Sequence, residues 1–298
     1  MSQALRVLIT GRHGFTGRYV AAELQSAGWD VWGVGTGVPS TPDEQYFQAD
    51  LTDRTALTRV IETVKPDAVV HLAAIAFVAH GTVEDFYRVN VIGTHILLDV
   101  VAQAGAGQSG VVLASSANIY GNAEISPIPE TAIPAPVNDY AVSKMAMEHM
   151  ARLFADRLPI TIARPFNYTG QDQSAQFLVP KIVAHFRDRA PKIALGNLDV
   201  ARDFSDVRDV ARIYRALLHS VPEQSVVNIC SGIATSLGNI LSTCQAITGH
   251  EIAVEVNPAF VRANEVKTLM GDATLCNQLV LANQRHSLQD TLEWMLGQ

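Results

Sequence analysis

Three side chains with complementary proton chemistry stand out in the middle of the chain. Tyr140 and Lys144 are four residues apart, so a helix would place both on one face, and Ser116 follows what reads as a buried strand. A free phenol has a pKa of roughly 10, and a lysine ammonium one helical turn away favours its ionised form. A carbonyl held between the Ser116 hydroxyl and the Tyr140 phenol would be polarised for hydride attack. The neighbouring Ser115 is the weaker serine candidate.

The first 26 residues read as a strand, a glycine loop and a helix. The apolar run 5–9 leads directly into Thr-Gly-Arg-His-Gly-Phe-Thr-Gly at 10–17. Gly11 would permit the tight turn, Gly14 would let the backbone approach a pyrophosphate, and Gly17 would allow close helix packing. The helix N-terminus attracts the same anion. We therefore predict a dinucleotide site here, with contacts from Gly11, Arg12, Gly14, Phe15, Thr16 and Gly17.

Gly35 bears on the choice of dinucleotide. It follows a second apolar strand at about 31–34, where dinucleotide folds often place an acid against the adenosine ribose hydroxyls. A carboxylate there would repel a 2′-phosphate, so its lack tolerates NADP. Arg12 could reach that phosphate as a bidentate donor. The sequence therefore favours NADP(H), with NAD(H) as the alternative.

Strand-like runs alternate with helical segments through the first half of the chain, at about 5–10, 31–34, 69–73, 111–115 and 160–164. This alternation predicts a parallel, doubly wound α/β sheet with helices on both faces. Asp50 and Leu51 follow a short strand at 46–48 and suit an adenine contact. The strand at about 69–74 would end against the cofactor at Leu72, Ala73 and Ala74. His71 is interpreted as a packed strand residue.

Composition narrows the function. The 298 residues are 48% hydrophobic and 17% charged, with a formal charge of −7 and a pI near 5.7. Nonspecific binding to nucleic acid or an anionic membrane is disfavoured, and a small anionic ligand is expected. Three cysteines lack disulfide or zinc spacing, and no apolar stretch approaches the roughly 20 residues of a membrane helix. We expect a cytoplasmic protein without a metal site.

In combination these motifs resemble the extended short-chain dehydrogenase/reductases of the sugar-nucleotide epimerase and dehydratase type, over nearly the whole chain. The resemblance implies that Ser116, Tyr140 and Lys144 are catalytic, that Asn90 supports the lysine, and that Pro165 lies near the nicotinamide. The shared wording consists of the glycine loop, Asp50-Leu51, His71-Leu-Ala-Ala74, Asn90-Val-Ile-Gly-Thr94, Ser115-Ser-Ala-Asn-Ile-Tyr-Gly121, Tyr140-Ala-Val-Ser-Lys144 and Arg164-Pro-Phe-Asn167.

The resemblance also implies a smaller C-terminal α/β substrate lobe. It divides the chain into a dinucleotide-binding, Rossmann-type domain at 1–165, to which 199–228 returns, and a nucleotide-sugar lobe at 166–198 and 229–298. A planar guanidinium such as that of Arg202 is well suited to grip a diphosphate. The substrate contacts implied, besides Ser116, are Asn167 at the sugar diphosphate, Val179 and Lys181 at the base, Arg202 at the diphosphate, and Arg262 with Glu265 as a second diphosphate arginine and its acid.

Within that family, the stretches 196–204 and 227–232 resemble the GDP-4-keto-6-deoxy-D-mannose reductases. This implies that NAD(P)H reduces the 4-keto group of a GDP-linked sugar to give GDP-D-rhamnose, with Tyr140 protonating the alkoxide. A 4-epimerase uses the same three catalytic residues, and their spacing does not separate the two. A 4,6-dehydratase is disfavoured because Ala117-Asn118 stands where its acid and base belong. The intact catalytic residues argue against a non-catalytic dinucleotide sensor.

Apolar stripes run along two expected helices, near 93–104 and 140–155. In the resembling family these two helices form a four-helix interface, which implies a homodimer. Ordinary packing on the sheet is the alternative interpretation. The stripes comprise Ile96, Leu97, Val100, Met147, Met150 and Leu153.

Overall fold

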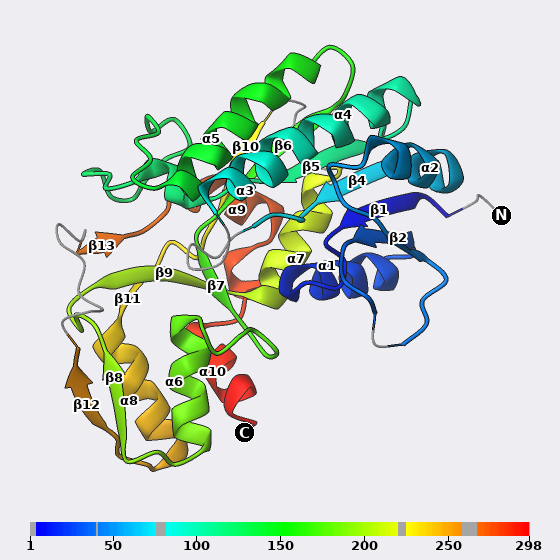
Figure 1. Ribbon diagram of the computed structural model, residues 1–298. Helices are drawn as coiled ribbons and strands as arrows, with labels where there is room; N and C mark the ends of the chain where they lie inside the picture. The colour runs from blue at the N-terminus through cyan, green and yellow to red at the C-terminus, as the bar shows by residue number, and fades with distance from the viewer. Residues whose placement is uncertain (1–3, 40, 76–81, 220–224, 258–266, 298) are drawn as a thin grey trace. The chain divides into compact units, whose positions relative to one another are not determined.

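The computed structural model describes residues 4–39, 41–75, 82–219, 225–257 and 267–297 (Figure 1). Its main sheet has seven strands in the order β10-β6-β5-β4-β1-β2-β3. The pairs β1–β2, β1–β4, β2–β3, β4–β5 and β5–β6 are all parallel. Strand β1 lies between β2 and β4, which is the order of a doubly wound sheet. The predicted fold class is confirmed.

The sheet and its helices come mainly from the first 165 residues. The elements are β1 (Arg6–Thr10), α1 (Phe15–Ser26), β2 (Asp30–Gly35), β3 (Tyr46–Gln48), α2 (Arg54–Val64), β4 (Ala68–His71), α3 (Val83–Tyr87), the π-helix η1 (Arg88–Gly93), α4 (Thr94–Gln103), β5 (Gly110–Ala114), the 3-10 helix η2 (Ala117–Tyr120), α5 (Asp139–Ala151), the 3-10 helix η3 (Arg152–Phe154), β6 (Ile160–Pro165), α7 (Val207–Leu217) and β10 (Val226–Ile229).

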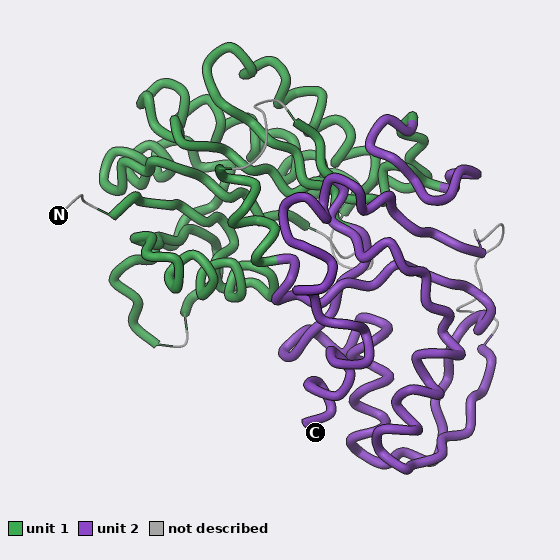
Figure 2. Tube along the Cα trace, turned by 180° about the vertical axis from the view of Figure 1, so that it is seen from behind, with its two compact units in different colours: residues 1–121, 133–165, 211–227 green, residues 122–132, 166–210, 228–298 purple. Residues whose placement is uncertain are grey.

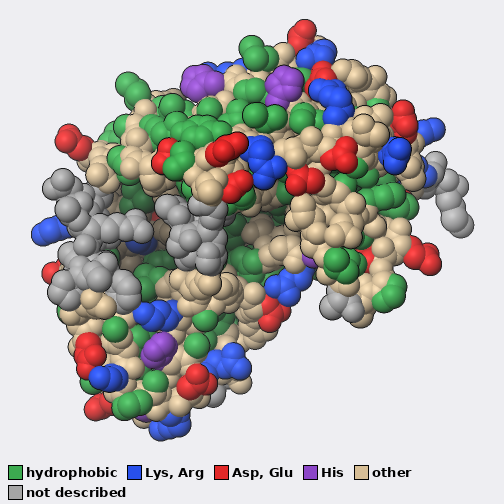
Figure 3. Space-filling view, viewed as in Figure 1, with side chains coloured by type: hydrophobic (Ala, Val, Ile, Leu, Met, Phe, Trp, Pro, Cys, Tyr) green, Lys and Arg blue, Asp and Glu red, His purple; other side chains and the backbone are tan. Residues whose placement is uncertain are grey.

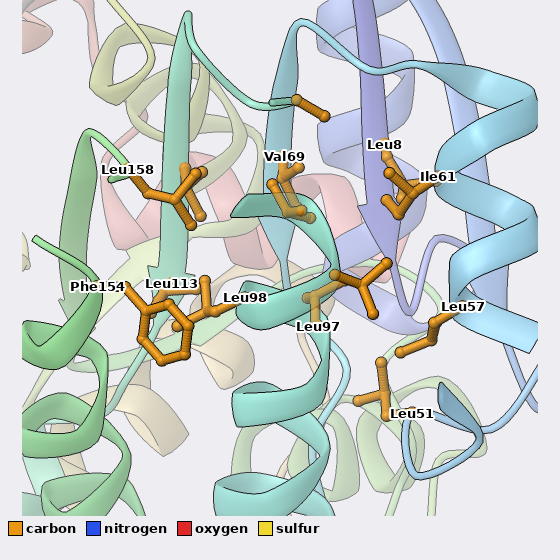
Figure 4. Packing of buried hydrophobic residues seen from close by; sticks show 14 of the residues in the cluster. Leu8, Leu51, Leu57, Ile61, Val69, Leu97, Leu98, Leu113, Phe154 and Leu158 are labelled. Atoms are coloured by element: carbon orange, nitrogen blue, oxygen red, sulfur yellow. The ribbon is translucent and has the colours of Figure 1, made fainter. Parts of the chain in front are cut away.

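The sheet is buried on both faces, which explains its continuous apolar strands. Figure 1 shows α2, α4 and α5 along one face and α1 with α7 along the other. Leu8 of β1, Val69 of β4 and Leu113 of β5 are fully buried and belong to one core cluster. Leu57 of α2 and Leu97 of α4 pack in the same cluster (Figure 4). This packing fixes the carboxyl ends of the central strands relative to one another.

The remaining elements build a second core. It packs α6, α8 and α10 around residues such as Ile182, Phe186, Leu195, Ile240 and Leu292. Strand β9 pairs with β11, β13 and β7, and β12 pairs with β8. These elements are β7 (Asn167–Thr169), α6 (Leu178–Arg187), β8 (Lys192–Leu195), β9 (Ala201–Asp206), β11 (Ala234–Ser236), α8 (Leu237–Thr248), β12 (Ala253–Val256), β13 (Thr268–Leu269), α9 (Thr274–Leu279), the 3-10 helix η5 (Ala282–Gln284) and α10 (Leu288–Leu296).

The chain divides into two compact units (Figure 2). Unit 1 consists of residues 1–121, 133–165 and 211–227, and unit 2 of residues 122–132, 166–210 and 228–298. Among the described residues, no helix is long and apolar enough to cross a bilayer.

The two helices with predicted apolar stripes differ from the sequence interpretation in detail. The first is α4, and it continues directly from the π-helix η1, which the sequence did not predict. Leu97, Val100 and Met147 are buried in the core cluster, so part of each stripe is ordinary packing. Leu153, in contrast, is 72% exposed on η3.

Candidate active site

The three predicted catalytic residues all lie in unit 1, Ser116 just after β5 and Tyr140 and Lys144 on α5. Ser116 caps the 3-10 helix that follows β5, and Tyr140 occupies the first turn of α5. The Asn138 side chain caps that helix by accepting the Ala141 N–H at 2.9 Å. Lys144 Nζ donates to Ala114 O at 2.7 Å, two residues before Ser116. The lysine therefore ties the catalytic helix to the strand end that carries the serine.

The Lys144 ammonium group is buried away from solvent. Its side chain is 2% exposed. Burial lowers the pKa of Lys144 from an ordinary 10.5 to about 8, while the negative charge of Glu148 opposes the shift. A lysine with a pKa of about 8 can change its charge near neutral pH.

Ser116 is positioned by the residue two places after it. Its Oγ accepts the Asn118 N–H at 3.2 Å and Asn118 Nδ2 at 3.0 Å. A hydroxyl has two lone pairs and one proton, so these bonds use the lone pairs and leave the proton to donate. The adjacent Ser115 Oγ is buried and has no hydrogen-bond partner among the described residues.

Asn90 lies in the π-helix η1 and is buried. Its Nδ2 donates to Ser143 Oγ at 3.0 Å and to Ile75 O at 3.2 Å, and its Oδ1 accepts the Ile75 N–H at 3.0 Å. Ser143 in turn donates to Tyr140 O at 2.8 Å. Asn90 therefore bonds to α5 at Ser143, the residue before Lys144, and its predicted support of the lysine stays a prediction. A π-bulge is a frequent feature of functional sites.

His71 is a packed strand residue, as predicted. Nδ1 lies 2.7 Å from Thr10 Oγ1, and Nε2 lies 2.8 Å from Thr94 Oγ1. Thr10 Oγ1 accepts the N–H groups of Leu72 and Ala73, so its proton goes to Nδ1. Thr94 donates to Asn90 O at 2.8 Å, so it accepts the Nε2 proton. Burial lowers the pKa of His71 to about 3, and the nearby Lys144 charge adds to the shift.

The glycine loop has the steric features of a phosphate cradle. Gly11 has a φ of +72°, which side chains disfavour. A Cβ on Gly17 would lie 2.6 Å from Arg12 O and would overlap Gly11 O. Gly14 precedes the first residue of α1, and no acidic residue lies in the first turn of that helix. The loop therefore brings backbone and a positive helix end to one place, which fits a dinucleotide pyrophosphate.

Arg12 has close partners within unit 1. Its Nη1 lies 3.1 Å from Asp43 Oδ2 and donates to Gln45 O at 3.1 Å. A Cβ on Gly35 would lie 2.9 Å from Tyr46 Oη, so a side chain there would have to shift the tyrosine hydroxyl. The sequence interpretation missed both the Asp43 pairing and this steric role of Gly35, because neither follows from spacing along the chain.

The other predicted cofactor contacts lie at strand ends of unit 1. The Asp50 carboxylate accepts the Thr52 N–H at 2.8 Å and Thr52 Oγ1 at 2.7 Å, and these bonds lower the pKa of Asp50. Leu51 is 5% exposed and packs in the core. The remaining predicted contacts, Leu72, Ala73 and Ala74 after β4 and Pro165 at the end of β6, are partly exposed.

The predicted substrate residues are distributed through unit 2. Asn167 is exposed at the start of β7, whereas the Val179 side chain is 2% exposed and belongs to the core of this unit. Lys181 Nζ donates to Ala194 O at 2.8 Å. Arg202 on β9 donates from Nη1 to Ala201 O at 2.9 Å. Arg262 and Glu265 lie outside the described residues.

The sequence interpretation also missed a buried charge network between α5 and β6. Arg164 donates to both carboxylate oxygens of Glu148, at 2.9 and 2.6 Å, and to Tyr120 Oη at 2.9 Å. Both charged side chains are at most 4% exposed. The i, i+4 spacing of Lys144 and Glu148 could have suggested the charge effect of Glu148 on the lysine pKa, but not the contact with Arg164.

Unit 2 contains a second buried carboxylate with a complete set of donors. Asp203 accepts the N–H groups of Ser231, Gly232 and Gly271 and the Ser231 hydroxyl.

Cys230, Cys244 and Cys276 are free and buried. In the described part of the chain, no cluster of histidine, cysteine and acidic residues could hold a metal ion.

The doubly wound sheet, the glycine cradle and the Tyr140–Lys144 helix define a dinucleotide-dependent enzyme. The model of the NAD dependent epimerase/dehydratase family matches residues 7–230. The chain therefore belongs to this family, the extended short-chain dehydrogenase/reductases, as the sequence predicted.

Two characterised relatives align over most of the chain. GDP-6-deoxy-D-talose 4-dehydrogenase of Aggregatibacter actinomycetemcomitans is 36% identical over 271 residues, which cover 90% of this chain and 88% of the relative. GDP-6-deoxy-D-mannose reductase of Pseudomonas aeruginosa is 32% identical over 278 residues, covering 89% and 88%.

Three solved structures share the fold over nearly their full length. A protein from Burkholderia cenocepacia J2315 is 48% identical with a TM-score of 0.92, covering 98% of this chain and 97% of its own. RMD from Pseudomonas aeruginosa, complexed with NADPH, is 27% identical with a TM-score of 0.85, covering 99% and 98%. UDP-glucose 4-epimerase from Thermus thermophilus, complexed with NAD, is 26% identical with a TM-score of 0.83, covering 98% of each chain.

Proposed function

We propose that this enzyme reduces the 4-keto group of a GDP-linked 4-keto-6-deoxy sugar with NAD(P)H, and that GDP-4-keto-6-deoxy-D-mannose is converted to GDP-D-rhamnose. The observation that carries the proposal is the position of Lys144, buried on α5 and bound to the end of the strand that leads to Ser116. The two relatives named for GDP-6-deoxy sugars support the substrate class.

Three residues of unit 1 have different roles in the proposed reduction. When bound, the nicotinamide supplies the hydride. The Ser116 proton, left over by its two bonds to Asn118, donates to the substrate carbonyl oxygen and polarises the carbonyl. Tyr140 gives its proton to the same oxygen as negative charge develops on it. Lys144 holds a positive charge one turn below the phenol, which stabilises the phenolate that remains.

The dinucleotide would be held by the glycine loop and the strand ends of unit 1. The pyrophosphate belongs at Gly11, Gly14 and Gly17, where side chains are excluded by neighbouring backbone. We propose that unit 2 supplies the substrate contacts, with Asn167 and Arg202 at the diphosphate. Lys181 and Val179 would contribute through their segment of backbone, because one side chain donates to β8 and the other is buried.

The test is direct. Purified protein is mixed with NADPH and GDP-4-keto-6-deoxy-D-mannose, and the loss of nicotinamide absorbance is followed. Consumption of one NADPH for each sugar supports the reductase, and a Tyr140→Phe variant should lose about 10²–10⁴-fold in kcat. Retention of most activity by Tyr140→Phe contradicts the assignment of the proton donor.

The configuration at C4 of the product separates the two GDP-sugar activities. D-Talose is the C4 epimer of D-mannose, so the names of the two relatives differ in the face on which C4 carries its hydroxyl. We propose the D-rhamnose configuration. NMR of the product that shows the 6-deoxy-D-talose configuration would replace D-rhamnose but keep the reduction itself.

A nucleotide-sugar 4-epimerase is the second candidate, favoured by the fold similarity to the Thermus thermophilus enzyme. An epimerase returns the hydride to the same sugar, so it shows no net NADPH consumption and often purifies with cofactor bound. Isomerisation of GDP- or UDP-sugars without net oxidation would favour it.

We propose NADP(H) as the preferred cofactor and NAD(H) as an alternative. Arg12 provides a guanidinium in the glycine loop, and no carboxylate occupies the end of β2 at Gly35. The relative titration of the protein with NADPH and NADH, followed by nicotinamide fluorescence, tests this preference. Tighter binding of NADH contradicts it.

We propose a homodimer formed through the helices α4 and α5. Figure 3 shows hydrophobic side chains gathered over these helices. Ile92 of η1, which precedes α4, and Leu153 of η3, which follows α5, are 54% and 72% exposed, and exposed apolar patches mark interaction surfaces. Light scattering that gives a monomer at micromolar concentration contradicts the dimer.

We propose that the protein is located in the cytoplasm, since its three cysteines are free.

A further inference from the structure

Asp43 lies beside the cation of the glycine loop. Its Oδ2 is 3.1 Å from Arg12 Nη1 and 3.6 Å from His13 Nε2. The side chains of Arg12 and Asp43 are only 12% and 20% exposed. Gln45 O accepts a second bond from the same Arg12 nitrogen at 3.1 Å. The guanidinium is therefore held by a carboxylate and a carbonyl, in a place where water screens charge less than it does at an open surface.

Packing fixes where the Arg12 side chain runs. A Cβ on Gly33 would lie 2.5 Å from Arg12 Cδ and 2.8 Å from Arg12 Cβ. The stem of Arg12 thus crosses β2 at a residue without a side chain. This position of the side-chain stem places the Arg12 guanidinium beside Asp43, and contacts within unit 1 hold both residues.

Tyr46, the first residue of β3, lies beside the end of β2. Its hydroxyl donates to Gly37 O at 3.0 Å and lies where a side chain on Gly35 would begin. Its ring lies 4.3 Å from the ring of His13, centroid to centroid. A carboxylate at position 35 would have to displace Tyr46. The carboxylate nearest to Arg12 is supplied instead from the segment after β2, at Asp43.

In doubly wound folds a carboxylate near the end of the second strand favours ribose hydroxyls over a 2′-phosphate. We propose that Asp43 sets the balance between NAD(H) and NADP(H), because its carboxylate binds the Arg12 guanidinium that a 2′-phosphate needs. This inference rests on the proposed function in one respect, which is that the glycine loop binds a nicotinamide dinucleotide. Arg12 attracts the phosphate and Asp43 competes for the same guanidinium, so Asp43 weakens the preference for NADP(H) that Arg12 creates.

The test compares Asp43→Asn with Glu44→Gln. Both variants remove one negative charge from adjacent residues, but Glu44 is exposed and has no interaction with Arg12 among the contacts of the described residues. Dissociation constants of NADPH and NADH are measured by fluorescence titration, which requires no sugar substrate. Asp43→Asn should tighten NADPH binding by about tenfold and change NADH binding by less than about twofold, while Glu44→Gln leaves the ratio unchanged.

A third variant shows whether Asp43 acts through Arg12. In an Arg12→Gln background, adding Asp43→Asn should change the ratio of the two dissociation constants by less than about threefold, because the competed group is gone. Equal effects of Asp43→Asn and Glu44→Gln, or an unchanged ratio in Asp43→Asn, overturn the role of Asp43. Failure of the wild-type protein to bind either dinucleotide overturns the proposed function instead, so the two failures are distinct.

Discussion

The dinucleotide-binding part of unit 1 and the proposed substrate-binding part of unit 2 depend on different kinds of residue. In unit 1, Gly11 and Gly17 act by lacking side chains, because backbone atoms occupy the space that a Cβ would need. In unit 2, the predicted contacts rest on long cations, and Lys181 and Arg202 both donate to main-chain carbonyls of their own unit. Only glycine meets such a steric requirement, whereas a long cationic side chain can bind either a carbonyl of its own unit or a ligand.

One ion pair from each unit shows how burial changes the role of charge. The Glu148–Arg164 pair of unit 1 is at most 4% exposed and has bidentate geometry. The Lys192–Glu255 pair of unit 2 is 63% and 57% exposed. Buried ion pairs penalise the loss of one partner because the other charge stays desolvated, and exposed pairs do not. The Glu148–Arg164 pair is therefore part of the architecture of unit 1.

Loss of the buried pair should give the largest effect. Glu148→Gln leaves the Arg164 charge buried without its counter-charge, so we expect a loss of about 3–5 kcal/mol in the free energy of unfolding. The matched Glu255→Gln variant should lose less than about 1 kcal/mol. Urea unfolding followed by circular dichroism measures both. Similar losses for the two variants would remove the contrast between the units.

Gly17 should be the next most sensitive position. In Gly17→Ala the new Cβ meets Gly11 O and Arg12 O, so the loop has to move and dinucleotide affinity should fall about 100-fold. Gly238 also stands in the first turn of a helix, but its Cβ would meet only Ser236 Oγ at 3.9 Å. Gly238→Ala is therefore the control. Titration with NADPH compares them, and unchanged affinity in Gly17→Ala speaks against a tight loop.

The contrast explains what the sequence could predict. The alternation of strands and helices and the positions of Gly11, Tyr140 and Lys144 follow from local patterns, since each depends on neighbours within a few residues. The sequence also identified His71 as a packed residue because a buried parallel strand is apolar throughout.

Contacts between distant residues could not be predicted in the same way. Asp43 meets Arg12 across 31 positions of sequence, and Arg164 meets Glu148 between a strand and a helix. Gly35 was interpreted by ligand chemistry, yet the Tyr46 hydroxyl also lies close to the place of a side chain there. Val179 was expected at a ligand, and the period of α6 turns its side chain into the core. Each case depends on which face of an element meets which neighbour.

Lys144 should give the activity a characteristic dependence on pH. Its pKa of about 8 means that the ammonium is present below pH 8 and is lost above it, so kcat should fall about tenfold per pH unit on the alkaline side. The folded pKa lies below the unfolded one, so the burial penalty is largest below pH 8 and is relieved as the pH rises toward 10.5. Activity should therefore fall before the fold does. Parallel measurements of kcat and circular dichroism between pH 6.5 and 10 test this, and constant kcat up to pH 10 contradicts it.

The smallest effect is expected at Lys181, and it brings the comparison back to unit 2. Its ammonium donates to Ala194 O, so Lys181→Met should raise the KM for the sugar nucleotide by less than about threefold. Arg202→Met removes a guanidinium suited to a diphosphate, and the same KM should rise at least about tenfold. Steady-state kinetics with saturating NADPH compare the two. A larger rise in KM for Lys181→Met than for Arg202→Met would mean that the lysine leaves β8 to reach the ligand, and that the cations of unit 2 rearrange where the glycines of unit 1 cannot.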